Sequence, residues 1–266
     1  MVTMKKEHNL IVGIFDLTGC NGCLNILISQ PEIVDIVDHL DIRSFRLASR
    51  GGLIDHYDVV LVEGTVVDEE EIDVLKRIRE RSDVLVALGS CACFGGIETI
   101  RNFEDLENTK RYVYKDGSAY IRAVEVKPLE SYVKVDYSIP GCPIDGKEAV
   151  EAIKALLVGK DPEILAYPVC FECKLRENEC VLLKGIPCLG PITRAGCKAR
   201  CPSNGQGCEG CRGPAKEINI TSELELLTEI IKREDITLAF RKYAGLSEKF
   251  RKIAEGKIDE VVKEGT

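Results

Sequence analysis

Cysteine is the residue type in this chain with the greatest capacity for chemistry, since 13 of the 266 residues are cysteines. The opening residues, MVTMKKEHNL, contain neither a twin-arginine pair nor a long apolar signal core, so we expect a cytoplasmic protein. Cytosolic thiols are kept reduced, and an odd number of cysteines cannot all pair. We therefore expect the cysteines to bind metal, with intracellular disulfides of the hyperthermophile kind as the alternative.

Four cysteines share a position in a loop just after a predicted strand. They are Cys20 and Cys23, Cys91, and Cys142. In an open parallel sheet, the loops at the carboxyl ends of the strands meet at one edge, so these thiols should converge. The motif TGCNGC also opens a predicted helix, whose positive end favours an anionic group. Four thiolates suit a cubane iron–sulfur cluster or a zinc ion, but one zinc ion would leave the other cysteines unexplained.

Two further residues lie near this expected site. Cys93 stands two positions after Cys91 and competes with it for the ligand role, although we interpret Cys93 as a small buried thiol. Glu63 closes an apolar strand at the same edge of the sheet. It is either a capping carboxylate or a group in contact with the metal, as a proton carrier or an oxygen ligand.

Short apolar runs alternate with helical patterns through the first part of the chain, which predicts an α/β fold with a flavodoxin-like parallel sheet. The predicted strands are residues 9–15, 57–62, 83–88 and 133–139. Helices are predicted over residues 68–81, with Leu75 and Ile78 on one apolar face, and over 145–158. We assign residues 1–165 to this domain and residues 166–266 to a second one.

The second domain opens with a segment rich in Cys, Gly and Pro, from about residue 167 to 214, that has no sustained apolar period. It contains eight cysteines: Cys170, Cys173, Cys180, Cys188, Cys197, Cys201, Cys208 and Cys211. Because such a segment cannot build an ordinary apolar core, we expect metal binding to stabilise it. Zinc ribbons are the alternative, since Cys-x-x-Cys pairs stand at both ends. From residue 222 onward, helical patterns return and should pack on the rest of the chain or on a partner.

Composition excludes several classes of function. A net charge of −8 and a pI near 5.2 argue against nucleic-acid binding, which needs a concentrated basic surface. No stretch reaches the roughly 18 uninterrupted apolar residues of a membrane span. Neither a Walker loop nor a GxGxxG fingerprint appears, so any nucleotide should bind to another chain. Abundant charged residues and scarce Met are typical of a thermophile.

The order of motifs in the first domain resembles that of the small subunits of nickel–iron hydrogenases. These motifs are TGCNGC, VEG, GSCACFGG and PGCPID. The related subunit of respiratory complex I has adjacent cysteines in its first motif, whereas Cys20 and Cys23 are separated here. The missing export signal and the all-cysteine second domain resemble the cytoplasmic branch, above all the delta subunits of archaeal NADP-linked hydrogenases (sulfhydrogenases), followed by the gamma subunits of deazaflavin-reducing hydrogenases.

The resemblance extends to the cysteine-rich segment. The sequence Cys-Phe-Glu-Cys at 170–173 is similar to the family's His-x-x-Cys pair, with cysteine in place of histidine, and CLGPIT from Cys188 is similar to its Gly-Pro-x-Thr stretch. On this mapping, a distal cluster is held by Cys170, Cys173, Cys180 and Cys188. A medial cluster is held by Cys197, Cys201, Cys208 and Cys211. Cys201 supplies a fourth thiolate that many periplasmic relatives lack, which implies a cubane.

The resemblance implies an electron-transfer subunit with three 4Fe-4S clusters, the proximal one held by the first four cysteines. It implies that the nickel–iron centre lies on a large (alpha) subunit and that FAD and NADP bind to a flavin/NAD(P)-binding subunit, with ferredoxin-like subunits as further partners. The alternatives are a zinc-stabilised interaction protein without enzymatic activity, and an iron–sulfur subunit of another oxidoreductase.

Overall fold

The computed structural model describes residues 9–48 and 52–264. The first eight residues, on which part of the expectation about export signals rests, lie outside the described residues. The chain forms two compact units. The first contains the residues up to Cys93 together with Pro128–Glu163, and the second contains Phe94–Lys127 together with the residues from Ile164 onward. The division placed at residue 165 did not anticipate that the segment Phe94–Lys127 belongs with the second unit.

A five-stranded parallel sheet forms the centre of the first unit, in the order β2-β1-β3-β5-β7. The strands are β1 (Leu10–Asp16), β2 (Leu40–Phe45), β3 (Tyr57–Glu63), β5 (Ser82–Leu88) and β7 (Tyr137–Ile139), and the short β4 covers Val66–Asp68. Counting the parallel strands along the chain, this is the 2-1-3-4-5 order of flavodoxin-like folds. The predicted α/β class is confirmed.

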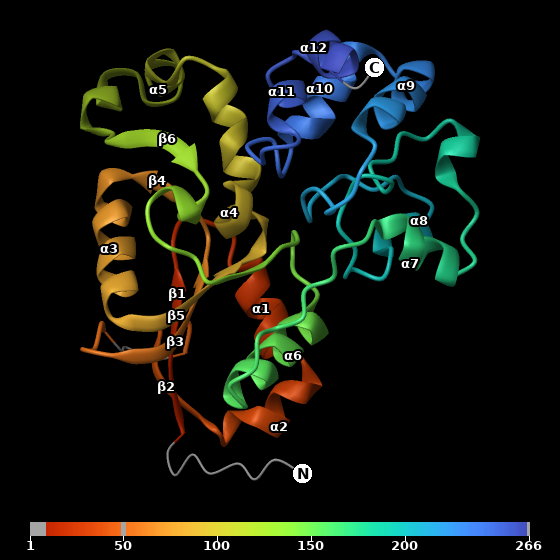
Figure 1. Ribbon diagram of the computed structural model, residues 1–266. Helices are drawn as coiled ribbons and strands as arrows, with labels where there is room; N and C mark the ends of the chain where they lie inside the picture. The colour runs from red at the N-terminus through yellow and green to blue at the C-terminus, as the bar shows by residue number, and fades with distance from the viewer. Residues whose placement is uncertain (1–8, 49–51, 265–266) are drawn as a thin grey trace. The chain divides into compact units, whose positions relative to one another are not determined.

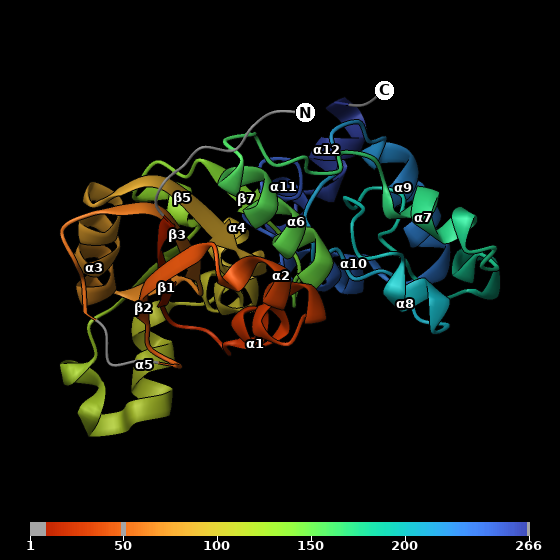
Figure 2. The same cartoon turned by 90° about the horizontal axis from the view of Figure 1, so that it is seen from below.

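Helices cover both faces of this sheet. Figures 1 and 2 show α1 (Gly22–Ile28), α2 (Val34–Val37) and α6 (Gly146–Leu157) together on one face and α3 (Glu69–Glu80) on the other. One core joins the first face to these helices through Leu24, Leu27, Ile36, Val150 and Ile153, which pack on Val12, Ile14, Val59, Leu61 and Val86. Burial on both faces explains why the strands are continuous apolar runs.

The predicted helices 68–81 and 145–158 are both present, as α3 and α6. An aspartate caps the start of each. Asp68 accepts a hydrogen bond from the Glu71 amide at 2.9 Å, and Asp145 accepts one from the Glu148 amide at 3.1 Å. Such caps satisfy amides that have no partner within the helix. Leu75 of α3 is fully buried, as its place on the predicted apolar face implies.

The last strand is shorter than predicted. Residues 133–136 lie outside β7, which covers Tyr137–Ile139. The Asp136 carboxylate accepts the Leu85 amide at 2.9 Å, while the Asp136 amide donates to the Leu85 carbonyl at 2.9 Å. A side chain thus takes a place that a backbone carbonyl fills in a regular ladder, so β7 begins at Tyr137, directly after Asp136.

The second unit combines the segment Phe94–Lys127, the cysteine-rich segment and the C-terminal helices. The first of these contains α5 (Leu106–Tyr114) and β6 (Ala123–Lys127), with 3-10 turns at Gly96–Phe103 and Lys115–Tyr120. The helix α4 (Gly89–Phe94) precedes it. The cysteine-rich part contains only short elements: α7 (Val169–Leu175), a 3-10 turn at Val181–Lys184, and α8 (Arg200–Ser203).

The C-terminal helices are α9 (Ile220–Ile230), α10 (Arg233–Arg241), α11 (Arg251–Ala254) and α12 (Ile258–Glu264). They share an apolar core in which the rings of Phe240 and Phe250 meet edge to face at 5.0 Å. Leu189 and Ile192 of the cysteine-rich segment join this core. The helices predicted from residue 222 onward therefore pack on the cysteine-rich segment of their own chain. In the part of the chain that the structure describes, no helix is both long and apolar enough to cross a bilayer.

The buried carboxyl group of Glu223, on α9, lowers the stability of the fold when it is ionised. Its side chain is 1% exposed, and among the described residues neither carboxyl oxygen has a hydrogen-bond partner. Burial raises the pKa of Glu223 from its ordinary 4.5 to about 7. Because the folded state holds this proton more tightly than the unfolded state, stability falls as pH rises between 4.5 and 7. Since one pKa unit corresponds to about 1.4 kcal/mol, the ionised side chain costs on the order of 3 kcal/mol above that window.

We therefore expect Glu223→Gln to stabilise the protein at pH 8 and to have a much smaller effect near pH 5.5. The measurement is the difference in melting temperature between variant and wild type as a function of pH. A stability change of 1 kcal/mol moves the melting temperature of a chain of this size by about 2–4 °C. Glu225→Gln, at an exposed position of the same helix, is the control. A pH-independent difference for Glu223→Gln would contradict this prediction.

Candidate metal centres

The structure brings four of the five cysteines of the first unit together at the carboxyl edge of the parallel sheet. Cys20 lies between β1 and α1, Cys23 lies in the first turn of α1, Cys91 lies on α4, and Cys142 follows β7. Burial raises the pKa of the Cys23 thiol, and the nearby Glu63, Cys91 and Cys142 raise it further. Thiolates at such a site repel one another. A bound metal stabilises them, because metal ligands must be deprotonated.

Glycines leave the space that these sulfurs occupy. A Cβ atom on Gly22 would lie 3.1 Å from Cys20 Sγ and 4.0 Å from Cys142's neighbour Pro143, which places Cys20 beside the Cys142 segment. A Cβ atom on Gly89 would lie 2.5 Å from Cys23 Sγ, and Gly89 has a φ of +87° that favours glycine. Both positions therefore fit a site in which the backbone closely surrounds the bound group.

Cys93 lies apart from this set. Its side chain is 7% exposed, and its thiol donates to the Ala87 carbonyl at 3.6 Å. Cys91, in contrast, is close enough to Cys23 to raise its pKa. This geometry supports the prediction that Cys91 is the ligand and that Cys93 is a small buried thiol.

Glu63 ends β3 and is 3% exposed. One carboxyl oxygen accepts the Cys23 amide at 3.1 Å, and the other accepts the Leu24 amide at 2.9 Å. Burial raises the pKa of Glu63, and these two hydrogen bonds oppose that shift. The carboxylate caps α1, whose N-cap residue Asn21 makes no side-chain cap. The structure therefore supports the capping role among those considered, and any contact of Glu63 with metal stays a prediction.

A second set of cysteines lies in the second unit, on and after α7. Burial raises the pKa of the Cys170 thiol to about 12, and Cys188, Cys173, Glu223 and Cys180 add to the increase. The other three cysteines mapped to the distal site are therefore within electrostatic reach of Cys170. A Cβ atom on Gly190 would lie 3.3 Å from Cys188 Sγ and 3.5 Å from Cys170 Sγ, so glycine again leaves the space beside two sulfurs.

The remaining cysteines form two pairs, Cys197 with Cys201 and Cys208 with Cys211. Burial raises the pKa of Cys201, with a further contribution from Cys197. It also raises the pKa of Cys208 well above its ordinary value, with contributions from Cys188 and Cys211. The Cys208 amide donates to Cys188 Sγ at 3.1 Å, so this set adjoins the preceding one.

A zinc site would require closely spaced sulfurs. A tetrahedral zinc ion with Zn–S bonds of about 2.3 Å would hold its sulfurs about 3.8 Å apart. Among the described residues, which include every cysteine, the group of three potential ligands within 4.8 Å of one another is His56, Asp58 and Asp83, and it contains no cysteine. Among the described residues, therefore, no three cysteine sulfurs lie within 4.8 Å of one another.

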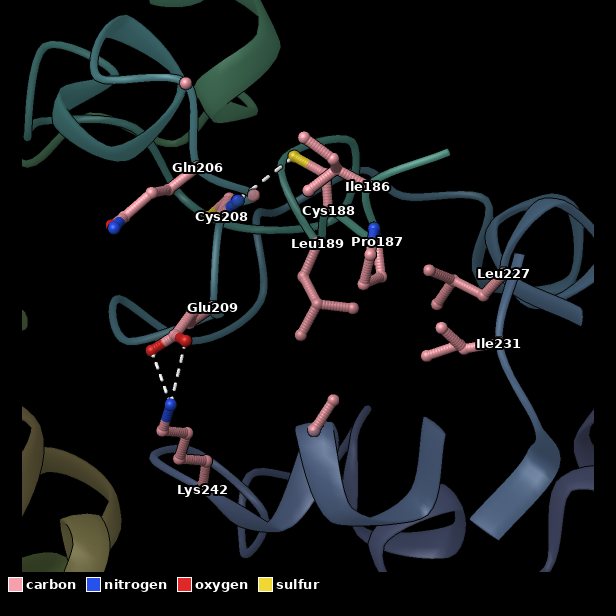
Figure 3. A pocket seen from close by; sticks show the side chains of 13 residues that line it. Ile186, Pro187, Cys188, Leu189, Gln206, Cys208, Glu209, Leu227, Ile231 and Lys242 are labelled. Carbon is pink, nitrogen blue, oxygen red and sulfur yellow. Dashed lines mark hydrogen bonds and ion pairs between the residues drawn. The ribbon is translucent and has the colours of Figure 1, made fainter. Parts of the chain in front are cut away.

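A cavity of about 410 Å³ lies behind the loops that carry Cys188 and Cys208. Aliphatic side chains of Leu189, Leu227 and Ile231 line it, and an ion pair joins Glu209 to Lys242 at 2.8 Å (Figure 3). Figure 3 also shows the Cys188 sulfur directed at the Cys208 amide rather than into this cavity. Cys188 and Cys208 are themselves among the residues that line this cavity, so it adjoins the candidate metal ligands.

The sequence pattern did not predict a role for two buried charged residues in the cysteine-rich segment. They are Glu172, between Cys170 and Cys173, and Arg212, directly after Cys211. Their side chains are 8% and 1% exposed. A charged residue adjacent to a candidate ligand was the one available signal, and it does not distinguish a buried side chain from a solvated one.

Comparison with known proteins gives consistent matches. The family model described as "NADH ubiquinone oxidoreductase, 20 Kd subunit" matches residues 20–156. The chain is 42% identical to sulfhydrogenase 2 subunit delta of Pyrococcus furiosus, over 88% of this chain and 98% of the relative. It is 36% identical to a subunit of the F420-non-reducing vhu hydrogenase of Methanocaldococcus jannaschii, over 76% of this chain and 81% of the relative.

Solved structures show the same likeness. A chain of an NAD⁺-reducing [NiFe]-hydrogenase in the H2-reduced state superposes with a TM-score of 0.53 at 25% identity. The match covers 59% of this chain and 95% of the other.

Proposed function

This chain belongs to the small-subunit family of nickel–iron hydrogenases and is thus an electron-transfer subunit of an oxidoreductase, and on that premise we propose that it holds three 4Fe-4S clusters. It relays electrons between the nickel–iron site of a large subunit and a flavin/NAD(P)-binding subunit. The proximal ligands are Cys20, Cys23, Cys91 and Cys142. The distal ligands are Cys170, Cys173, Cys180 and Cys188, and the medial ligands are Cys197, Cys201, Cys208 and Cys211.

The observation that carries this proposal is the gathering of cysteines from distant segments of the chain beside one another. When bound, an iron–sulfur cluster supplies one-electron oxidation and reduction. The chain supplies thiolate ligands, of which Cys23, Cys188 and Cys208 are each under 9% exposed, whereas Cys20, Cys142 and Cys180 are exposed. The amide end of α1 adds positive potential beside Cys23.

The partners in this proposal are the large (alpha) subunit, the flavin/NAD(P)-binding subunit and ferredoxin-like subunits, with FAD and NADP bound outside this chain. The name of the NAD⁺-reducing structural relative supports a nicotinamide acceptor. Such an acceptor also supports a cytoplasmic location, since nicotinamide dinucleotides are intracellular.

A complex I-like oxidoreductase is the second candidate, because the matching family model is described by a complex I subunit. The match to the sulfhydrogenase subunit covers more of this chain than that model does, which favours the hydrogenase. Nickel in the copurified large chain separates the two candidates.

Metal analysis of the purified native complex tests the proposal. We expect about twelve irons and as many acid-labile sulfides per copy of this chain, beyond those of other subunits, because each cubane contains four of each. We also expect nickel in the large subunit. A colourless chain with stoichiometric zinc would overturn the proposal and favour the zinc-stabilised interaction protein.

A further inference from the structure

The loop that carries Cys197, residues 195–199, has a strained backbone. Gly196, Lys198 and Ala199 have φ angles of 118°, 56° and 48°. Lys198 and Ala199 are not glycine, and the left-handed region is strained for a residue with a side chain. Such a conformation persists when the surrounding contacts hold it in place. The contacts of the Cys197 loop therefore decide where its sulfur lies.

Glu172 holds one side of the Cys197 loop. Its carboxylate accepts the Gly196 amide at 3.0 Å and the Ala199 amide at 3.3 Å, one on each oxygen. Glu172 lies on α7 between Cys170 and Cys173, so it joins the helix of the second cysteine set to the loop of the third. Figures 1 and 2 show α7 and α8, which follows the loop, in the same region of the second unit.

Arg212 holds the other side. Its Nε donates to the Ala195 carbonyl at 2.7 Å, and the guanidinium is almost fully buried. Arg212 follows Cys211 directly, so this bond joins the Cys197 loop to a second ligand segment of the same set. The backbone adds a third attachment, since the Ala195 amide donates to the Tyr167 carbonyl at 2.8 Å.

We propose that Glu172 and Arg212 are positioning residues that clamp the Cys197 loop and so define the third, medial metal site; this inference rests on the proposed function. Buried charged side chains are costly unless they are paired or hydrogen-bonded, and both of these bond to the loop itself. Their opposite charges match its backbone: the carboxylate accepts from amides and the guanidinium donates to a carbonyl.

Arg212 has a second, electrostatic effect. Guanidinium groups stay charged at all working pH values. A positive charge buried beside Cys211 stabilises the more negative, reduced form of an anionic group bound there. Arg212 therefore raises the midpoint potential of the medial centre relative to a neutral side chain.

The test of Glu172 is the iron content of the purified complex and its EPR spectrum after reduction. We expect Glu172→Ala to lose about a third of the iron of this chain and the signal of one cluster, because each of three cubanes holds four irons. Glu172→Gln keeps one acceptor oxygen and should lose less. The control is Glu179→Ala, an exposed glutamate one residue before Cys180 that pairs with Lys184 at 2.7 Å. Full iron and an unchanged spectrum in Glu172→Ala would overturn the clamp.

The test of Arg212 is an EPR-monitored redox titration of the complex. Arg212→Gln keeps an N–H donor but removes the charge, whereas Arg212→Lys keeps the charge but loses the planar donor. We expect Arg212→Gln to lower the midpoint potential of one cluster and Arg212→Lys to stay closer to wild type. Equal potentials in wild type and Arg212→Gln would refute the electrostatic effect. Absence of iron from the wild-type chain would instead refute the proposed function, so the two failures are distinguishable.

Discussion

Replacement of Cys91 by alanine is expected to remove one of the three proposed clusters, whereas replacement of Cys93 by alanine should remove none. The two cysteines stand two residues apart on α4, yet Cys91 is within electrostatic reach of Cys23 and the Cys93 thiol donates to the Ala87 carbonyl. Loss of a thiolate ligand opens the proximal site, so iron in this chain should fall by about a third in Cys91→Ala. Hydrogen-dependent reduction of the nucleotide acceptor should fall to background, because the relay is broken at its first position.

Cys93→Ala is the matched control for this experiment. It removes one small buried group and should cost about 1 kcal/mol of stability, as typical single substitutions do. Iron, sulfide, the EPR spectrum and hydrogen-dependent activity are measured for both variants of the complex. Iron loss in Cys93→Ala together with full iron in Cys91→Ala would reverse the ligand assignment.

The architecture of the first unit could be predicted because burial leaves a direct mark on the sequence. The run Val59–Val62 is apolar on both faces since helices cover both sides of the sheet, and its place before Glu63 locates the sheet edge. The convergence of Cys20, Cys91 and Cys142 followed from the topology alone, because parallel strands end at one edge. The approach of residues far apart in the sequence could thus be predicted where the sheet topology implied it.

Other features depend on contacts that no local pattern reveals. The segment Phe94–Lys127 belongs with the second unit through packing, which has no sequence period of its own. The start of β7 depends on the Asp136 carboxylate bonding to Leu85, and the role of Glu63 depends on which amides meet its oxygens. Glu172 resembles a solvated charge until the structure shows its carboxylate on the Cys197 loop.

Gly89→Ala is expected to damage the proximal site more than the same change at a second glycine with similar backbone geometry. Gly89 has a φ of +87°, and an added Cβ atom would lie 2.5 Å from Cys23 Sγ, a distance that real Cβ contacts do not reach. Gly159 has a φ of +69°, but an added Cβ atom would meet nothing within 4 Å. Alanine at either position carries the backbone cost of the left-handed region, about 1–2 kcal/mol. Only the change at Gly89 also displaces the sulfur of Cys23, a proposed ligand.

The comparison of the two variants therefore separates backbone strain from crowding of the sulfur. Both should lower the melting temperature of the complex by a few degrees, since 1 kcal/mol corresponds to about 2–4 °C in a chain of this size. Gly89→Ala should in addition lose about a third of the iron of this chain, because Cys23 cannot stay in place beside the new methyl group. Equal iron contents in the two variants would mean that the site tolerates movement of Cys23, and that the glycine serves the turn alone. A selective loss in Gly89→Ala would show that the glycine is required because the cluster ligand occupies the space of its missing side chain.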